Sequence, residues 1–109
     1  MTGEVFRDVY RYEFTDAVPA VEVETTLLLS IFGVEALHGE SQARLDIQHA
    51  FEPKKRVVVI DGSTAVGRDL NRLFLGFMTR EFGPGSFRVE RIQRPQEAKE
   101  KAQPEPVTA

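Results

Sequence analysis

Four short segments of the chain carry the hydrophobic patterns of β-strands, and in two of them hydrophobic and polar residues alternate, as in strands that bury one face. In the first segment, Tyr10, Tyr12 and Phe14 lie on one face, and Arg11 and Glu13 lie on the other. A later segment, RVVVID, is a β-branched run of the kind that central strands use. The four segments are residues 9–14, 43–51, 56–61 and 86–92. We therefore predict four strands.

Two longer segments, residues 18–38 and 64–82, carry apolar residues at spacings of three and four. This spacing places them on one face of a helix. Asp16 and Pro19 are suited to the start of the first helix and Gly39 to its end. We expect the glycines and proline of residues 83–85 to stop the second helix.

The resulting order, β-α-β-β-α-β, predicts an α+β fold of the split βαβ or ferredoxin-like kind. We expect a four-stranded antiparallel sheet with two helices on one face. The face bearing Tyr10 and Tyr12 should be the core, because burying the arginine face would leave unpaired charges. Residues 1–92 should form this single domain. Residues 93–109 are polar and proline-rich, and we expect them to form a flexible tail.

Composition narrows the classes of protein to consider. The chain has 109 residues, 41% of them hydrophobic, and a net charge of −3. This describes one ordinary globular domain without the basic excess of general nucleic-acid binders. Cysteine is absent, which excludes disulfides and thiolate metal sites. No signal peptide or membrane-spanning segment is evident, so we expect a cytoplasmic protein with no membrane contact.

The segment from Gly62 to Gly67 satisfies the spacing G-x-x-x-x-G of a phosphate-binding loop. The Lys and Ser/Thr that complete such a loop are replaced by Arg68 and Asp69, so a nucleotide hydrolase is disfavoured. Two interpretations remain. Ser63 or Thr64 caps the second helix and the glycines serve packing, or Ser63, Thr64 and Arg68 bind an anion at the helix start.

Candidate metal ligands and catalytic groups are sparse. Glu35 and His38 share one helix face, but this E-x-x-H pair occurs once, whereas di-metal bundles use it twice. His49 occupies a strand position that should face inward, as a hydrogen-bonded core histidine. No catalytic triad or pair of acids can be assembled. We predict no metal site and no cofactor, and the sequence favours a non-enzymatic module.

Nucleic-acid binding is a third possibility. Arg7, Arg11, Arg44 and Arg88 are expected on the sheet face that the helices leave open. Acidic residues share that face, and no aromatic residue is expected there to stack on bases. This composition disfavours nucleic acid as a partner.

The most informative feature is an excess of apolar residues on the first helix. Ala20, Val23, Leu27, Ile31 and Val34 already form an inward stripe, yet Leu29, Phe32 and Ala36 lie off it. A helix packed on a sheet needs one apolar face, and a second one left in water is unusual. The alternative is a single wide stripe buried between the sheet and the second helix. We predict that these three residues contact a partner protein or a second copy, most simply in a two-fold dimer.

Overall fold

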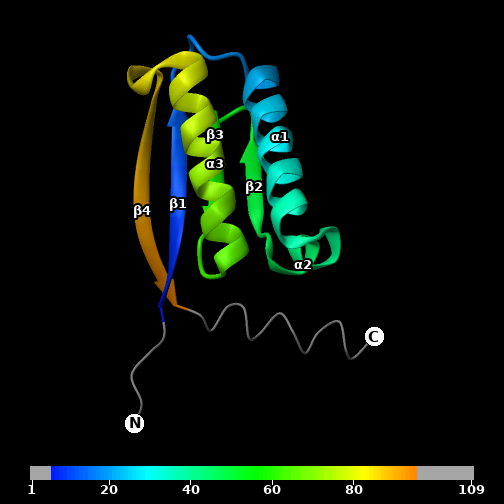
Figure 1. The fold of residues 1–109 in the computed structure, drawn as a ribbon. Coiled ribbons are helices and arrows are strands. Elements are labelled where there is room, and N and C mark those ends of the chain that lie inside the picture. The colour runs from blue at the N-terminus through cyan, green and yellow to red at the C-terminus, as the bar shows by residue number, and fades with distance from the viewer. Residues whose placement is uncertain (1–5, 96–109) are drawn as a thin grey trace.

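The computed structural model describes residues 6–95 as a small α+β domain with helices on one side of a sheet (Figure 1). The elements in chain order are β1 (Phe6–Phe14), α1 (Ala20–His38), α2 (Glu40–Asp46), β2 (His49–Glu52), β3 (Val57–Asp61), α3 (Ala65–Phe82), the 3₁₀ turn η1 (Pro84–Ser86) and β4 (Phe87–Pro95).

The sheet has the strand order β2-β3-β1-β4, and every neighbouring pair is antiparallel. The register pairs Tyr12 with Val58 on β3 and with Val89 on β4. Because directly paired residues point to the same face, it also places Arg11 beside Val59 and Glu90 on the opposite face. The α+β class and the four-stranded antiparallel sheet are therefore confirmed.

The core lies between the sheet and the two long helices, which run side by side (Figure 1). Tyr12 and Phe14 of β1 are buried there, and both rings pack edge-on against Phe74 of α3. The Tyr12 hydroxyl donates to Asn71 Oδ1, and burial raises the pKa of this phenol above its ordinary value. The aromatic face of β1 is thus the buried face, as predicted.

The prediction of only two helices was wrong. Residues 43–46, expected in a strand, belong to α2, and β2 begins only at His49. Two side-chain contacts at i,i+4 spacing support this helix: Arg44 with Glu40 at 2.6 Å and Gln42 with Asp46 at 2.8 Å. Leu45 is 76% exposed, so the apparent alternation did not mark a buried face.

Glycines end the two long helices, and a threonine hydroxyl caps the start of α3. Gly39 and Gly83, which end α1 and α3, have φ values of 90° and 86°, a region that favours glycine. Thr64 caps α3, and its Oγ1 accepts from the Gly67 N–H at 2.9 Å. Asp16 does not cap α1, which begins after Pro19 without a side-chain cap. Instead, Asp16 lies 3.7 Å from Arg56.

At the other end of the domain, β4 continues to Pro95, past the expected boundary at Ile92. Most of the predicted tail, residues 96–109, lies outside the described residues.

Candidate functional site

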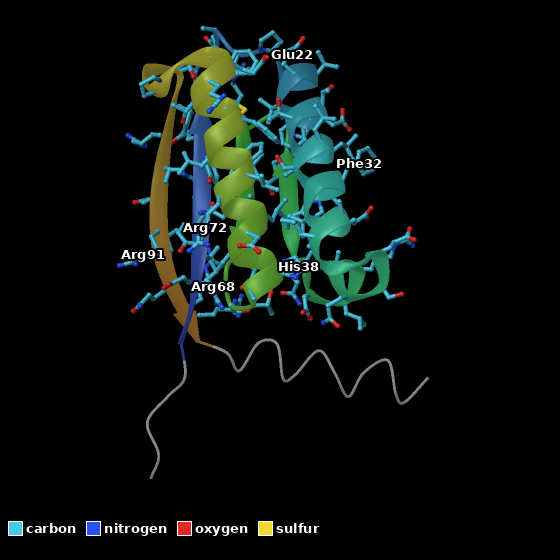
Figure 2. The ribbon with its side chains drawn as sticks, viewed as in Figure 1. Glu22, Phe32, His38, Arg68, Arg72 and Arg91 are labelled. Atoms are coloured by element: carbon cyan, nitrogen blue, oxygen red, sulfur yellow. The ribbon has the colours of Figure 1, made fainter. Side chains whose placement is uncertain are left out.

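The outward side of α1 carries a continuous row of apolar and uncharged residues, which we call the α1 stripe. Its members are Val21, Thr25, Leu28, Leu29, Phe32 and Ala36. Val21 is 64% exposed, Leu28 48%, Leu29 55% and Phe32 58%. Figure 2 shows Phe32 projecting from α1 away from the sheet. The residues predicted to lie off the inward stripe are therefore exposed; their role as an interface stays a prediction.

The periodicity of α1 explains why this row faces solvent. Val23, Leu27 and Val34 are buried against the core on the opposite side of the helix. Ser30 is also buried, and its hydroxyl donates to the Thr26 carbonyl at 2.8 Å. On the stripe itself, the Thr25 hydroxyl donates to the Val21 carbonyl at 2.9 Å. The stripe thus offers methyl groups and rings, with its one hydroxyl already hydrogen-bonded.

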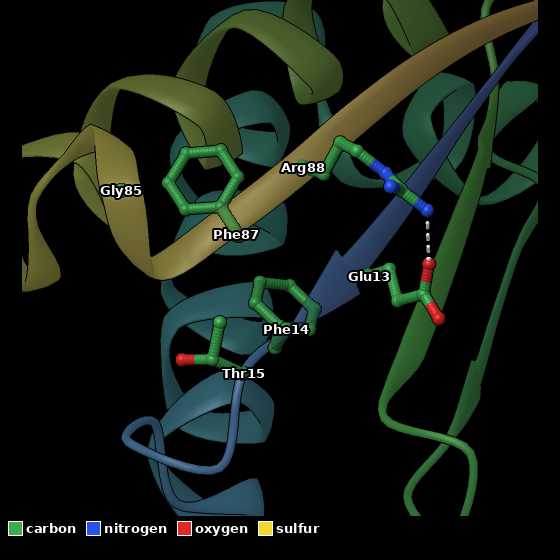
Figure 3. A pocket seen from close by; sticks show the side chains of 6 residues that line it. All are labelled: Glu13, Phe14, Thr15, Gly85, Phe87 and Arg88. Carbon is green, nitrogen blue, oxygen red and sulfur yellow. Dashed lines mark hydrogen bonds and ion pairs between the residues drawn. The ribbon is translucent and has the colours of Figure 1, made fainter.

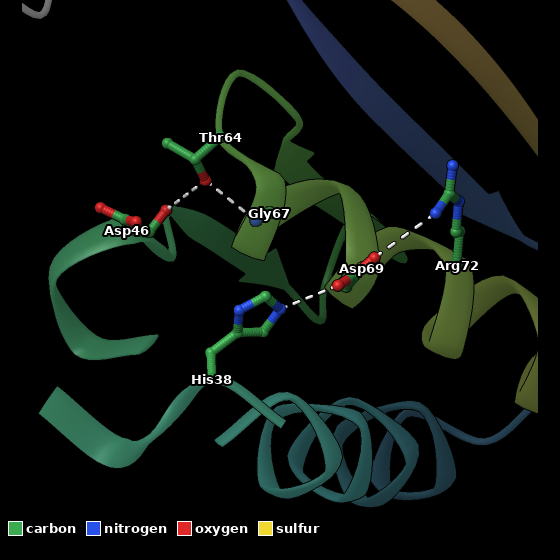
Figure 4. Close-up of polar contacts among 6 residues, drawn as sticks. All are labelled: His38, Asp46, Thr64, Gly67, Asp69 and Arg72. Atoms are coloured by element: carbon green, nitrogen blue, oxygen red, sulfur yellow. Dashed lines mark hydrogen bonds and ion pairs between the residues drawn. The ribbon is translucent and has the colours of Figure 1, made fainter. Parts of the chain in front are cut away.

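A glycine and a histidine–aspartate contact set how α1 lies against α3. A Cβ atom on Gly33 would lie 3.0 Å from Leu73 Cδ1, so the two helices approach closely there. Near the other end of the contact, His38 Nε2 lies 2.8 Å from Asp69 Oδ2 (Figure 4). Arg72 Nη1 lies 3.5 Å from the other oxygen of Asp69. The helices are therefore held antiparallel in a fixed register.

Charge divides the helix layer into two halves. α1 carries glutamates at three positions and no lysine or arginine. α3 presents exposed arginines, of which Arg68 and Arg72 are labelled in Figure 2. The three glutamates give α1 a charge of −3, whereas α3, with three arginines, Asp69 and Glu81, has a net charge of +1.

The loop before α3 was the second candidate site, and its groups bond within the chain. The Ser63 N–H donates to Asp61 Oδ1 at 2.8 Å, and Arg68 Nη1 donates to the Gly62 carbonyl at 3.3 Å. Besides capping the helix, the Thr64 hydroxyl donates to the Asp46 carbonyl at 3.2 Å (Figure 4). These contacts agree with the structural interpretation of the loop. Anion binding by Ser63, Thr64 and Arg68 stays a prediction.

Close packing explains both glycines of this loop. A Cβ atom on Gly67 would lie 2.1 Å from the Asp61 carbonyl oxygen, so the first turn of α3 lies directly on the end of β3. A Cβ atom on Gly62 would lie 2.6 Å from the Tyr10 ring. Neither glycine has the positive φ of a left-handed turn. The two glycines have the spacing of a phosphate-binding loop, but here they allow this loop and the start of α3 to pack closely against β1 and β3.

Of the four arginines predicted on the open face of the sheet, the fold places three there. Arg7, Arg11 and Arg88 share the open face, but Arg44 lies on α2, so its predicted place on the sheet was wrong. The three that share the face have acidic neighbours. Arg7 lies 3.0 Å from Asp61, whereas Arg11 and Arg88 lie 3.6 and 2.8 Å from Glu13. Nucleic-acid binding gains no support from this pairing.

A pocket of about 350 Å³ lies at the end of β1 and β4, beside the Arg88–Glu13 pair (Figure 3). Phe14 and Phe87 form its apolar wall, and Thr15 and Gly85 complete the lining. Its one acid and one base pair with each other, and we assign it no chemistry.

The histidines do not form a metal centre with their neighbours. Within residues 6–95, no three carboxylate or imidazole side chains are grouped so as to hold a metal ion. Glu35 and His49 both line a small pocket of about 210 Å³ between α1 and α2. His49 is exposed on the edge strand rather than enclosed in the core as predicted. Partial burial of its ring still lowers the pKa of His49.

Comparison with protein-family models, with curated proteins and with solved structures gives no match for this chain. None of the helices between residues 6 and 95 is both long and apolar enough to span a bilayer.

Proposed function

We propose that this chain is a small non-enzymatic module that acts by self-association, as a homodimer formed through the α1 stripe. The observation that carries the proposal is the exposure of Leu29 and Phe32 in the middle of an uncharged helix face. A continuous exposed apolar surface of several hundred Å² is often a site of interaction. A cytoplasmic location, expected from the sequence, stays part of this proposal.

The exposed area agrees with what a dimer needs. At roughly 200 Å² for a large apolar residue, Val21, Leu28, Leu29 and Phe32 together expose about 450 Å². A standard interface buries about 800 Å² per partner, of which about 65% is apolar in homodimers. The stripe supplies most of that apolar area from one helix.

A second copy fits this surface better than the chain's own C-terminal segment does. Residues 93–109 contain one large aliphatic residue, Val107, which is too little to cover four large side chains. Two stripes can face each other without burying a charge at their centre, since the three acids of the helix, Glu22, Glu24 and Glu35, lie along the edges of the stripe. Self-pairing of one surface is also the commonest symmetry among oligomers.

We also propose that the fold is the split βαβ arrangement expected from the sequence. The antiparallel pairings make β1 and β2 parallel with β3 between them, and β3 and β4 parallel with β1 between them. A long helix connects each parallel pair. This topology supports the proposed function by leaving the outer surface of the helix layer free for a partner.

The test is the solution mass of matched variants, measured by light scattering after size-exclusion chromatography. We expect the wild-type chain to reach twice its monomer mass of 12.3 kDa as concentration rises. Phe32→Asp should stay monomeric over the same range, because a buried, unpaired carboxylate opposes association. Leu45→Asp is the control, since Leu45 of α2 is an exposed apolar residue outside the α1 stripe.

Monomeric wild type at every concentration would contradict the proposal. So would a Phe32→Asp variant that dimerises as tightly as the Leu45→Asp control.

A further inference from the structure

We propose that the pocket between α1 and α2 binds a small alkylamine in its ammonium form, and that the Glu35 carboxylate holds the cation. The pocket lies where the end of α1, α2 and the start of β2 meet (Figure 1), and it measures about 210 Å³. None of the described residues that line it belongs to the α1 stripe. The inference therefore goes beyond the proposed function and does not rest on it.

A single short segment of the chain builds this pocket. Gly39, with a φ of 90°, ends α1 and lets α2 turn back beside it. The Gly39 N–H donates to the Glu35 carbonyl at 2.8 Å, and the Ala43 N–H donates to the Gly39 carbonyl at 3.0 Å. β2 begins at His49, shortly after α2 ends. Every described residue that lines the pocket lies within residues 31–49.

Three apolar side chains form one wall of the pocket. They are Ile31 of α1, Ala43 of α2, and Ile47, which follows α2 directly. Ala43 is fully buried, and the two isoleucines are half-buried and pack against the core. Sites for drug-sized ligands usually measure about 300 Å³ or more. This wall therefore suits a ligand with a hydrocarbon chain of only a few carbon atoms.

Glu35 gives the pocket its charge. It follows Ile31 by four residues, so both side chains lie on the same side of α1. Its side chain is half-buried, and it has no ion-pair partner among the described residues. A carboxylate that borders an apolar wall without a counter-ion favours a cation beside it, because burial weakens its hydration.

The two other polar side chains of the pocket do not offset this charge. Arg44 Nη2 lies 2.6 Å from Glu40 Oε2, so the charge of Arg44 is already paired. Partial burial lowers the pKa of His49 from its ordinary value of 6.5, so its ring is mostly neutral at neutral pH. A neutral imidazole keeps one nitrogen that accepts a hydrogen bond, and an ammonium group has three N–H donors. Together with the apolar wall, these groups match a short primary amine.

The test is a titration of the full chain with n-butylamine at neutral pH, followed through backbone amide signals in two-dimensional nuclear magnetic resonance spectra. The amine is protonated under these conditions, as a lysine side chain is. We expect saturable shifts within residues 31–35 and 43–49, with a Kd of about 1 mM, since the ligand has few atoms. 1-Butanol lacks the charge and butyrate reverses it, so each should bind at least about tenfold more weakly.

Two matched variants place the cation. Glu35→Gln keeps the shape of the side chain and removes its charge, so it should weaken butylamine binding at least about tenfold. Glu24→Gln makes the same change on α1 at an exposed position outside the pocket, and it should bind as wild type does. Circular dichroism should show both variants folded. Butylamine binding that is unchanged in Glu35→Gln, butyrate that binds as tightly as butylamine, or no saturable shift below about 20 mM amine would overturn the proposal.

Discussion

The hydrogen atom that serves as the side chain of Gly67 allows α3 to begin directly against the end of β3. Any Cβ atom there would lie 2.1 Å from a backbone oxygen, well inside van der Waals contact, and a backbone atom cannot rotate away as a flexible side chain can. Gly76, on the same helix, has open space in place of that oxygen. The two glycines have the same chemistry and opposite surroundings.

We predict opposite effects for alanine at these two positions. Gly67→Ala should lower the free energy of unfolding by about 2–4 kcal/mol, because the first turn of α3 must move off β3. Gly76→Ala should raise it by about 0.5–1 kcal/mol, since alanine is the better helix former and meets no obstacle. Urea denaturation of dilute protein measures both, and a Gly67→Ala variant as stable as wild type would contradict the packing described here.

Tyr12 provides a second residue-scale prediction, which depends on pH. Its buried hydroxyl bonds to Asn71, and burial raises its pKa. Tyr12→Phe should cost about 1 kcal/mol near neutral pH through loss of this bond. Above about pH 10, the unfolded tyrosine ionises while the folded one keeps its proton, so the unfolded state gains stability.

The advantage of wild type over Tyr12→Phe should therefore shrink between pH 9 and pH 11, a range that follows from the ordinary tyrosine pKa of about 10. Urea denaturation of both proteins across this range measures it. An advantage that grows with pH would show that the phenol is not buried in its protonated form.

At the scale of the elements, the α1–α3 pair shows what local patterns can reveal. The apolar spacing of residues 64–82 and the glycine at each helix end predicted the two long helices correctly, because helix formation depends on residues close together in the sequence. The exposure of Leu29 and Phe32 was also predictable, because a helix can turn only one face to a sheet.

The α2 segment shows where such reasoning fails. Ala43, Leu45 and Ile47 alternate as a strand would, but the pairs Glu40–Arg44 and Gln42–Asp46 stabilise a helix. Those pairs are visible in the sequence and could have identified α2. By contrast, the contact of Gly67 with β3 depends on how α3 docks, which no local pattern specifies.

The start of α3 carries the element-scale prediction. Thr64→Ala should lower the free energy of unfolding by about 1–2 kcal/mol, because it removes the helix cap and the bond to the Asp46 carbonyl at the end of α2. Ser63→Ala should change it by less than about 0.5 kcal/mol, since the N–H that bonds Asp61 is retained. Thermal or urea unfolding of the two variants measures the difference, and equal losses would contradict Thr64 as the cap.

At the scale of the whole molecule, the two surfaces of the domain differ in kind. The open sheet face carries arginines that lie beside acids of the same face, Arg7 beside Asp61 and both Arg11 and Arg88 beside Glu13. The helix layer instead combines an uncharged stripe on α1 with exposed arginines on α3. It is this second surface that we propose binds a second copy.

Contacts between copies can be observed directly by isotope-filtered nuclear magnetic resonance on a mixture of labelled and unlabelled wild-type chains. With a monomer mass of 12.3 kDa, even the dimer is small enough for this measurement. We predict nuclear Overhauser effects between the Phe32 ring of one copy and side chains of the α1 stripe of the other. Effects that instead join residues of the open sheet face, such as Val59, or none between chains at concentrations well above a micromolar, would contradict association through α1.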